Sequence, residues 1–440
     1  MSFITDKQTL DDLNIPGKYK QQSIFSLFND TRTSGGEKLL EKMFNQPLSD
    51  PAAINSRSEV FQYFHNRKLS FPFNQEQFQA AETYLGAGTG SSFIAVAAGL
   101  LQKKVMQLAV KDEHYAQLQS GVLAAFDLLN TLQDFLQKTD DVQGLPSTEL
   151  FEMVKSLFNG QRMKWLKEAR SDQQLTLMQL ARYDHLIRHV LRDELEKILD
   201  FIYHLDVFIA VSNVARARNF FYAQALPKEK NIFRAAALSH PAIEKAVANP
   251  VSQHEDQNVL FLTGANMAGK STFMKSLGIA VYLGHMGFPV AAKELVFSVR
   301  DGLYTSINVS DNLNLGYSHF YAEVLRVKKV AEEVAKGNDL VVIFDELFKG
   351  TNVKDAYDAT LAVTKEFSTY RNSFFVISTH IIEVGHTLME ECNNVQFSYL
   401  PTIMEGNVPR YTYTLSRGIT NDRHGMLIIE NERILDMMQE

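Results

Sequence analysis

The sequence has a single cysteine, Cys392, among 440 residues. One thiol cannot form an internal disulfide, and its isolation excludes zinc sites that are built from several cysteines. Such low cysteine usage is typical of a reducing compartment, so we expect a cytoplasmic protein. The first residues also lack the basic lead and the apolar core of a secretion signal.

Long apolar runs and an excess of basic residues are missing as well. The longest apolar run, residues 93–101, has about half of the roughly eighteen residues that a membrane span requires, so we expect no association with a membrane. The chain has 44 Lys and Arg residues against 51 Asp and Glu, a formal net charge of −7. This balance supplies no overall attraction to nucleic acid.

Glycine and proline are absent from residues 161–226, where apolar residues recur at helical spacing. This pattern predicts one long helix or two nearly continuous helices. Residues 107–138 carry a similar apolar stripe, and a turn is expected at residues 143–147. We interpret residues 1–226 as an α-helical domain and residues 227–250 as a joint.

After the joint, short β-branched and aromatic runs alternate with helical stretches. The pattern predicts strands at residues 259–262, 340–344 and 374–377, and helices at residues 272–282 and 355–370. Strands and helices that alternate in this way form a parallel sheet with helices on its faces. The sequence therefore predicts an α/β domain over residues 251–440.

The most specific motif follows the first of these strands. Residues 264–271 read Gly, four residues, then Gly-Lys-Ser, which is the pattern of a phosphate-binding loop, and we call them the phosphate loop. Its two glycines allow backbone N–H groups to point at a β-phosphate, and Lys270 would reach the β- and γ-oxygens. Ser271 would ligate Mg²⁺ at the positive end of the following helix. The predicted nucleotide-binding residues are Gly264, Ala265, Asn266, Met267, Ala268, Gly269, Lys270, Ser271 and Thr272.

Two acidic residues, Asp345 and Glu346, follow the strand predicted at residues 340–344. The carboxyl end of a buried parallel strand lies at the same sheet edge as the phosphate loop. Asp345 is then placed to hold Mg²⁺ through water, and Glu346 to orient and deprotonate the attacking water. An acidic pair after a strand also fits a solvated turn, but the phosphate loop in the same domain favours the catalytic interpretation.

His380 follows the third predicted strand, within Ser378-Thr379-His380. A histidine at this edge would hydrogen-bond the γ-phosphate and report its cleavage, although a lone histidine is otherwise often structural. We predict that His380 acts in catalysis together with Glu346 and Lys270. No Asn-Lys-x-Asp motif for guanine follows the phosphate loop, so we expect ATP.

Together these motifs resemble the ATPase domain of the MutS mismatch-repair family. The phosphate loop with its Asn-Met pair, the acidic motif at residues 345–352 and residues 378–380 are each similar to a block of that family. Residues 318–320 resemble its signature serine segment, so Ser318 is implied to reach the γ-phosphate of a partner subunit. Tyr413 stands at the position of a family histidine and is implied to offer an aromatic platform, whereas Val251 stands where an adenine-stacking phenylalanine is expected.

The likeness extends upstream of the ATPase motifs. Residues 28–50 resemble the opening of the family's helical core or lever domain, and residues 205–222 resemble its close. The resemblance implies a domain III-like lever domain over residues 1–226 and a domain V-like P-loop ATPase domain of the ABC type over residues 251–440. Because the lever match starts almost at the first residue, we expect no mismatch-binding or connector domain and no mismatch reading of the family's usual kind.

The resemblance also implies a function: ATP hydrolysis with Mg²⁺ by a homodimer that forms through paired ATPase domains. A role on DNA, in repair or recombination, follows by analogy, with recognition of the backbone or of branched structures. The basic residues Arg162, Lys164, Lys167 and Arg170, with Trp165 among them, form either a DNA contact or a solvated helix face. Two alternatives remain: an ATP-gated protein-interaction switch that binds no nucleic acid, which the net charge favours, and a phosphotransferase, which the acidic pair disfavours.

Overall fold

The chain forms two compact units that interleave along the sequence. The computed structural model describes residues 3–16, 22–87, 114–139, 148–169, 174–307, 319–405 and 408–420. The helical unit comprises Asn29–Lys42 and Glu59–Asn213, and the sheet unit comprises Met1–Phe28, Met43–Ser58 and Val214–Glu440. Three segments of residues 1–226, the region that the sequence assigns to a helical domain, therefore cluster with the sheet unit: Met1–Phe28, Met43–Ser58 and residues 214–226.

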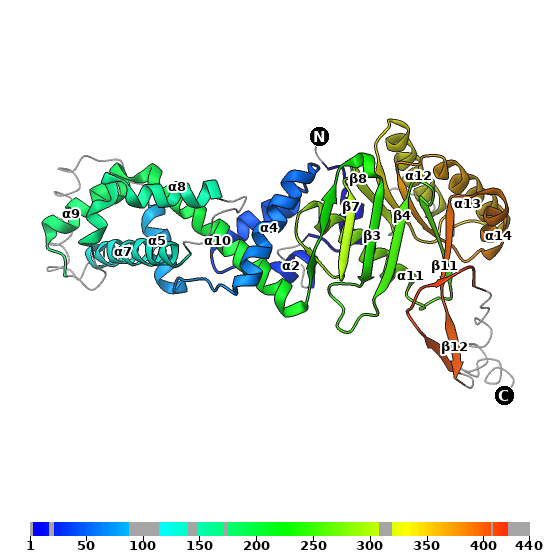
Figure 1. The fold of residues 1–440 in the computed structure, drawn as a ribbon, viewed down its shortest axis with the longest axis horizontal. Coiled ribbons are helices and arrows are strands. Elements are labelled where there is room, and N and C mark those ends of the chain that lie inside the picture. Colours follow the sequence, from blue (N-terminus) through cyan, green and yellow to red (C-terminus); the bar gives the residue numbers. More distant parts are fainter. Residues whose placement is uncertain are drawn as a thin grey trace. The chain divides into compact units, whose positions relative to one another are not determined.

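The helical unit is built from helices (Figure 1). These helices bury apolar side chains against one another. Its core includes an ion pair, in which the buried carboxylate of Asp184 accepts hydrogen bonds from Tyr84 Oη at 2.8 Å and from Arg188 Nε at 2.6 Å. The elements with residues in this unit are α3 (Ser34–Asn45), α4 (Pro51–Arg67), α5 (Gln75–Gly86), α7 (His114–Lys138), α8 (Thr148–Asn159), the 3₁₀ helix η1 (Gln161–Lys167), α9 (Leu177–His185), the π-helix η2 (Leu186–Val190) and α10 (Arg192–Arg218).

The prediction of two nearly continuous helices within residues 161–226 is confirmed, but this stretch is not α-helical at either end. It begins with the 3₁₀ helix η1, and helices α9 and α10 are nearly continuous through the π turn η2. α10 ends at Arg218, where Asn219 adopts a positive φ of 54°, and β1 (Phe221–Tyr222) and β2 (Gln224–Leu226) follow. These short strands pair with β6 and β7, so long-range pairing overrides a locally helical pattern.

Helix α10 is the one helix in the described parts of the chain that is long and apolar enough to cross a bilayer. However, 72% of its most apolar window is buried inside the protein. Core helices share this composition, and the burial of α10 accounts for its apolar character.

A six-stranded, mostly parallel sheet forms the centre of the sheet unit. Its strand order is β14-β11-β5-β10-β9-β8, with only β14 antiparallel to its neighbour. Its strands are β5 (Val259–Gly264), β8 (Gly302–Ser306), β9 (Leu340–Phe344), β10 (Phe374–Ser378), β11 (Val395–Leu400) and β14 (Ser416–Arg417). The three strands predicted from sequence are confirmed, and each is an apolar run because its residues are buried on both faces.

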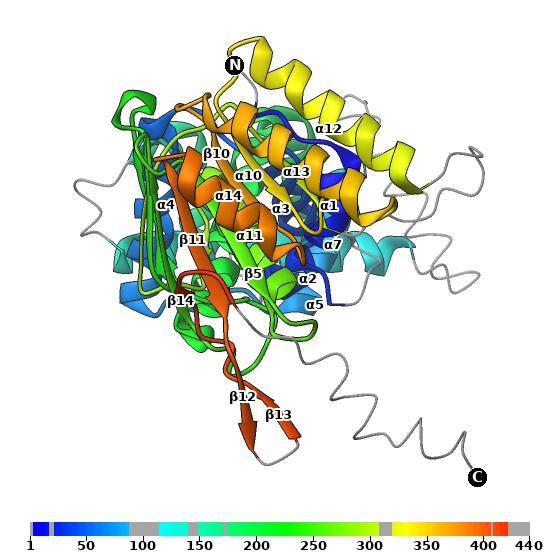
Figure 2. The same ribbon diagram turned by 90° about the vertical axis from the view of Figure 1, so that its right-hand side faces the viewer.

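Helices cover both faces of this sheet. One face, which includes Phe261, Phe344 and Phe375, packs against α12 (His319–Ala335), α13 (Val353–Ser368) and α14 (Ile382–Glu391), seen together in Figure 2. The alternate residues face α11 (Lys270–His285), where a Cβ on Gly278 would lie 3.2 Å from Ile343 Cδ1. The α/β architecture expected from the sequence is therefore present in the described residues of this region.

The region predicted as a joint is part of a second sheet. Its strand order is β2-β7-β3-β4, with β3 (Ile232–Leu238) hydrogen-bonded to both β4 (Asn249–His254) and β7 (Glu294–Ser298). Within the region predicted as a joint, residues 232–238 and 249–250 thus belong to a sheet. The remaining elements of the sheet unit are α1 (Lys7–Asp12), α2 (Ile24–Phe28), the 3₁₀ helix η3 (Lys228–Lys230), β6 (Pro289–Val290) and the β12–β13 hairpin (Thr402–Glu405 and Val408–Tyr411), which projects from the six-stranded sheet in both views.

Candidate nucleotide-binding site

Three neighbouring parallel strands end at one edge of the six-stranded sheet. β10 lies between β5 and β9 and pairs in parallel with both. The carboxyl end of β5 continues into the phosphate loop, that of β9 into Asp345 and Glu346, and that of β10 into Thr379 and His380. Ligand sites in open α/β sheets commonly lie at this edge. The fold therefore brings the predicted phosphate loop, acids and histidine together.

The phosphate loop makes a tight turn that two glycines permit. Gly264 and Gly269 have φ values of +146° and +104°, where a side chain would be strained. A Cβ on Gly264 would also lie 3.2 Å from the carbonyl oxygen of Leu400, and one on Gly269 would lie 3.0 Å from Tyr413 Cδ1. Met267, at a φ of 67°, has 76% of its surface exposed at the tip of the loop. The backbone is thus held in the tight curl that the motif predicts.

Lys270 is the first residue of α11 and lies inside the phosphate loop. Only 5% of its surface is exposed, and its Nζ donates to the carbonyl oxygens of Gly264 at 2.8 Å and Ala265 at 3.2 Å. Burial lowers the pKa of Lys270, while the nearby charges of Asp345 and Glu346 act to raise it. A buried ammonium group held by carbonyl dipoles is suited to exchange those partners for anionic oxygens.

Asp345 connects the phosphate loop to β10. One of its carboxylate oxygens accepts a hydrogen bond from Ser271 Oγ, and the other accepts one from Ser378 Oγ. The Asp345 backbone N–H donates to the carbonyl oxygen of Ser306 in β8 at 2.9 Å. Ser271 and Asp345 thus bring a hydroxyl and a carboxylate together at the mouth of the loop.

These oxygen donors fit Mg²⁺, which is usually held by one or two protein oxygens, water and substrate phosphates. The described residues contain no cluster of three or more His, Cys, Asp or Glu side chains that would form a closed metal site. The donor set therefore fits a metal that arrives with a phosphorylated ligand.

Glu346 is held in a strained conformation beside His380. Its φ is 56°, in the left-handed region, and its backbone N–H donates to both the carbonyl oxygen and Oγ of Ser378 at 3.1 Å. Its Oε1 lies 2.6 Å from His380 Nε2, and its Oε2 lies 3.8 Å from Lys349 Nζ. The hydrogen bond with His380 is the main cause that holds the pKa of Glu346 below its ordinary value.

The comparisons with known proteins cover both halves of the chain. Residues 260–436 match the family model of MutS domain V, and residues 8–212 match that of MutS domain III. The chain belongs to the MutS family. The DNA mismatch repair protein MutS of Petrotoga mobilis is 26% identical over 314 residues, which cover 68% of this chain and 38% of that protein. The MutS of Leuconostoc mesenteroides is 22% identical over 525 residues, which cover 97% of this chain and 60% of that protein. The chain thus spans about two fifths and three fifths of these relatives.

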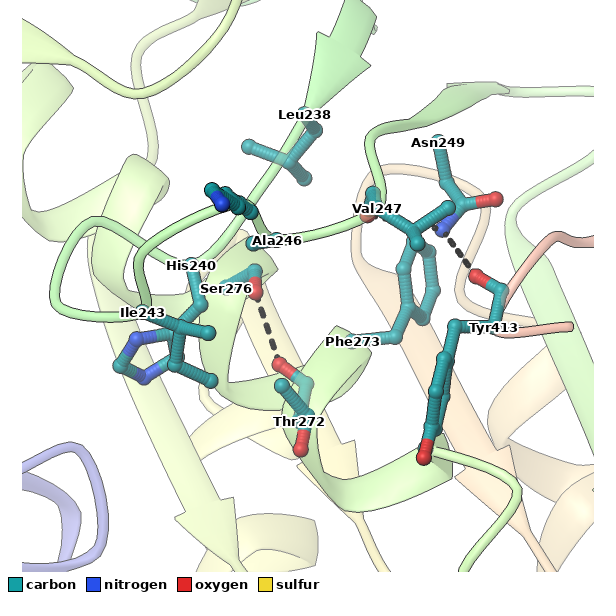
Figure 3. Close-up of a pocket in the computed structure, with 12 residues that line it drawn as sticks. Leu238, His240, Ile243, Ala246, Val247, Asn249, Thr272, Phe273, Ser276 and Tyr413 are labelled. Carbon is teal, nitrogen blue, oxygen red and sulfur yellow. Dashed lines mark hydrogen bonds between the residues drawn. The ribbon is translucent and has the colours of Figure 1, made fainter. Parts of the chain in front are cut away.

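A pocket of about 380 Å³ opens beside the phosphate loop (Figure 3). Tyr413 lies against Gly269 on one side, and its carbonyl oxygen accepts a hydrogen bond from Asn249 Nδ2 at 2.9 Å. The same Asn249 accepts one from the Leu415 backbone N–H at 2.7 Å, so it fixes the connection between β13 and β14 that carries Tyr413. The other lining residues are Leu238, His240, Ile243, Lys245, Ala246, Val247, Thr272, Phe273 and Ser276.

The character of this pocket is mainly apolar. Ile243, Val247, Phe273 and the ring of Tyr413 supply aliphatic and aromatic surface. Burial lowers the pKa of His240 to about 4, so its ring is neutral at neutral pH. This lining fits a flat, uncharged group that is attached to a phosphate chain, with the phosphate chain bound in the phosphate loop.

Sequence reasoning located some members of the site and missed others. Tyr413 lies at the pocket, whereas Val251 is buried in β4 opposite Ala235 and does not line it. Ser318 falls outside the described residues. The segment from Leu238 to Asn249 was missed because it was interpreted as a joint. Its short apolar pair, Ile243 and Val247, carries no motif that indicates a pocket.

Proposed function

We propose that this MutS-family chain is a Mg²⁺-dependent ATPase with an ABC-type P-loop domain. The observation that carries the proposal is the convergence at one sheet edge of a glycine-lined loop, Lys270, the Ser271–Asp345 pair and Glu346. Anion cradle, metal donors and a base are the parts that phosphoryl transfer to water requires. The resemblance of this domain to the ATPase domain of the family supports the same function.

Each side chain has one role in this proposal. Backbone N–H groups of the phosphate loop and Lys270 bind the phosphate oxygens, and Ser271 and Asp345 hold Mg²⁺. When bound, the metal would neutralise charge on the β- and γ-phosphates. Glu346 takes a proton from a water whose oxygen attacks the γ-phosphorus, the bond to the ADP oxygen breaks, and inorganic phosphate is released. His380 holds the Glu346 carboxylate until nucleotide binds and then contacts the γ-phosphate.

The pocket beside Tyr413 is proposed to take the adenine base. Its apolar walls bury the flat faces of a base, and Tyr413 offers a ring for stacking. Asn249 holds the Tyr413 backbone and so sets the position of that ring. Tyr413→Ala is expected to weaken ATP binding, with a smaller effect on the turnover of bound ATP.

Phosphate release without an added acceptor tests the ATPase proposal and distinguishes it from a phosphotransferase. The purified chain should release phosphate from ATP only when Mg²⁺ is present. Lys270→Ala should lose ATP binding through loss of the cation on the phosphates. Thermal unfolding of both proteins gives the control for folding. An absence of both ATP binding and phosphate release in the folded parental chain would reject the proposal.

We further propose that ATP joins two copies of the chain, with Ser318 of each completing the other's site. The ATPase domain resembles that of a family of such dimers, and the γ-phosphate would supply contacts to both subunits that hydrolysis removes. Mass measurement should show a dimer with ATP and Mg²⁺ in the Glu346→Gln protein. Mixing Ser318→Ala with Lys270→Ala subunits should restore activity, because one of the two shared sites is then intact. No gain on mixing would show that the sites are not shared.

We propose that the protein binds branched or duplex DNA through contacts to the DNA backbone. The alternative is an ATP-gated protein-interaction switch that binds no nucleic acid. The relatives named above are DNA mismatch repair proteins. The basic residues near η1 support DNA binding less than the sequence pattern suggests. Arg162 hydrogen-bonds Glu194, and Trp165 packs with ring centroids 5.7 Å from both Phe126 and Tyr183. Lys164 and Lys167 are exposed, and Arg170 lies outside the described residues.

Salt-dependent binding distinguishes the two roles. Branched and linear duplex DNA are titrated with the protein at several salt concentrations, with and without ATP. Backbone recognition predicts an affinity that falls steeply as salt rises, because bound cations are released from the phosphates. Lys164→Gln with Lys167→Gln should reduce the salt slope. If neither DNA binds at low salt, the interaction switch is the better description.

A further inference from the structure

The N-terminal segment covers the free edge of the six-stranded sheet. Ile4 forms a parallel bridge with Gly302 of the edge strand β8. The Ile4 backbone N–H donates to the carbonyl oxygen of Asp301 at 2.7 Å, and its own carbonyl oxygen accepts from the Leu303 N–H at 2.9 Å. A Cβ on Gly302 would lie 2.4 Å from the Ile4 carbonyl oxygen, so this approach requires glycine. Ile4 is thus hydrogen-bonded to the backbone on both sides of Gly302.

Helix α1 continues this segment to the other end of β8. The carboxylate of Asp12, which is 4% exposed, accepts hydrogen bonds from Thr305 Oγ1 at 2.7 Å and from the Ile307 backbone N–H at 2.9 Å. Thr9 Oγ1 accepts from the Thr305 N–H at 3.1 Å. A buried acid in the last turn of a helix is opposed both by desolvation and by the helix dipole. Its hydrogen bonds to β8 offset that cost.

The opposite side of β8 holds the backbone of Asp345, the predicted metal ligand. The carbonyl oxygen of Ser306 accepts from the Asp345 backbone N–H at 2.9 Å. Ser306 lies between Thr305 and Ile307, the two residues that Asp12 binds. Asp12 therefore holds the Thr305 side chain on one side of the carbonyl group that locates Asp345 and the Ile307 backbone on the other. A change at Asp12 would shift that carbonyl and, with it, the Asp345 backbone.

We propose that Asp12 is a positioning residue for Asp345, acting through the end of β8, and this inference rests on the proposed role of Asp345 in holding Mg²⁺. Asp12 touches neither nucleotide nor metal in this role. Its loss should affect the metal more than the nucleotide, because the phosphate loop lies on β5, two strands away from β9. The separation of these two effects makes the inference testable.

The test measures phosphate release by the full chain as a function of Mg²⁺ and, separately, nucleotide binding in EDTA. Asp12→Ala should raise the Mg²⁺ concentration for half-maximal activity about tenfold, as loss of a metal site's supporting shell commonly does. Nucleotide binding in EDTA should stay within about twofold of the parental value, since the phosphate loop keeps its contacts. Asp12→Asn should recover part of the loss, because its amide oxygen still accepts from the Ile307 N–H.

Two further variants keep the test decisive. Thr305→Val removes one hydroxyl and should shift the Mg²⁺ requirement in the same direction, even if Asp12→Ala does not fold. Asp6→Asn loosens the start of α1 but leaves the contacts to β8 by Asp12 in place, so its Mg²⁺ requirement should be parental. The inference would be overturned if folded Asp12→Ala and Thr305→Val needed the same Mg²⁺ concentration for half-maximal activity as the parental chain. It would also be overturned if Asp6→Asn raised that concentration as much as Asp12→Ala does. A parental chain that releases no phosphate at any Mg²⁺ concentration would reject the ATPase proposal as well.

Discussion

His380 Nε2 lies 2.6 Å from Glu346 Oε1, so the imidazole holds the carboxylate that is proposed to activate water. This contact lowers the pKa of Glu346 and so favours its charged form. The Glu346 backbone is meanwhile held at a positive φ by its bonds to Ser378. The Glu346 carboxylate is thus preorganised in its charged form. When nucleotide binds, His380 must either move away from this carboxylate or keep its hydrogen bond to it while the carboxylate also bonds the water.

Replacement of this carboxylate tests its role directly. Glu346→Gln keeps the size of the side chain and its hydrogen bond with His380 but cannot take a proton. We expect ATP binding to stay within about twofold while turnover falls about 100-fold or more, the usual contribution of a positioned base. Single-turnover phosphate release and equilibrium binding measure the two quantities. Parental turnover in this variant would remove Glu346 from the mechanism.

The pH dependence of activity should follow the Glu346–His380 contact. Because the contact lowers the pKa of Glu346, the carboxylate stays ionised to lower pH than an ordinary glutamate. His380→Ala should raise that pKa and move the acid limb of the kcat/KM profile to higher pH. Lys349→Ala, which removes a weaker influence at 3.8 Å, should move it less. An acid limb that stays in place or moves to lower pH would contradict the assignment.

The ion pairs of Asp6 should make stability depend on pH. Asp6 bonds Arg326 and Lys329, and these contacts outweigh burial and hold its pKa well below the ordinary value. A depressed folded-state pKa gives stability that is present above the unfolded pKa, near 3.8, and is lost as pH falls toward the folded value.

We therefore expect Asp6→Asn to lower the free energy of unfolding at pH 7 by about 3 kcal/mol, because Arg326, 5% exposed, loses its charged partner. The difference from the parental chain should narrow below about pH 4. Denaturant unfolding at several pH values measures it. Lys365→Gln, which breaks an exposed pair with Glu391, is the control and should change little. A constant difference across pH would exclude the ion pair as its source.

Gly269→Ala should disturb the phosphate loop in two ways, by straining the backbone at residue 269 and by crowding the ring of Tyr413. Alanine at a φ of +104° is strained, and its Cβ would lie 3.0 Å from the ring of Tyr413. Strain of about 1–3 kcal/mol in the loop should weaken ATP binding about tenfold or more. Gly337→Ala is a matched control, since its φ is +86° but nothing lies within 4 Å of the added Cβ. The control should lose some stability and keep ATP binding, as calorimetry can measure.

The residues at the sheet edge could be predicted because short stretches of sequence contain the patterns that place them there. Buried parallel strands are short apolar runs, and the polar residues that follow them must lie where the strands end, as Asp345 and His380 do. The close approach of Ser271 to Asp345 follows from the strand order, with β10 between β5 and β9. Local patterns do not contain that order, so sequence could predict a shared edge but not the pairs of atoms in contact.

Other features depend on partners far away in the chain. The strands after Arg218 continue a helical pattern and become strands only because β6 and β7 pair with them. The pocket wall from Leu238 to Asn249 takes its shape from contacts such as that of Asn249 with Tyr413. The role of Asp12 likewise depends on Thr305, 293 residues away. None of these long-range contacts produces a periodic pattern in the sequence around the residues that form it.

The interleaving of the two units bears on how the protein can be dissected. A fragment that starts at Val214 would lack Met1–Phe28 and Met43–Ser58, which belong to the sheet unit. The outer side of β8 would then present unpaired backbone groups and an apolar flank, a template for pairing with other chains. Expression of the fragment that starts at Val214 should therefore yield aggregates unless the missing N-terminal pieces are supplied, for instance as a fused or co-expressed peptide.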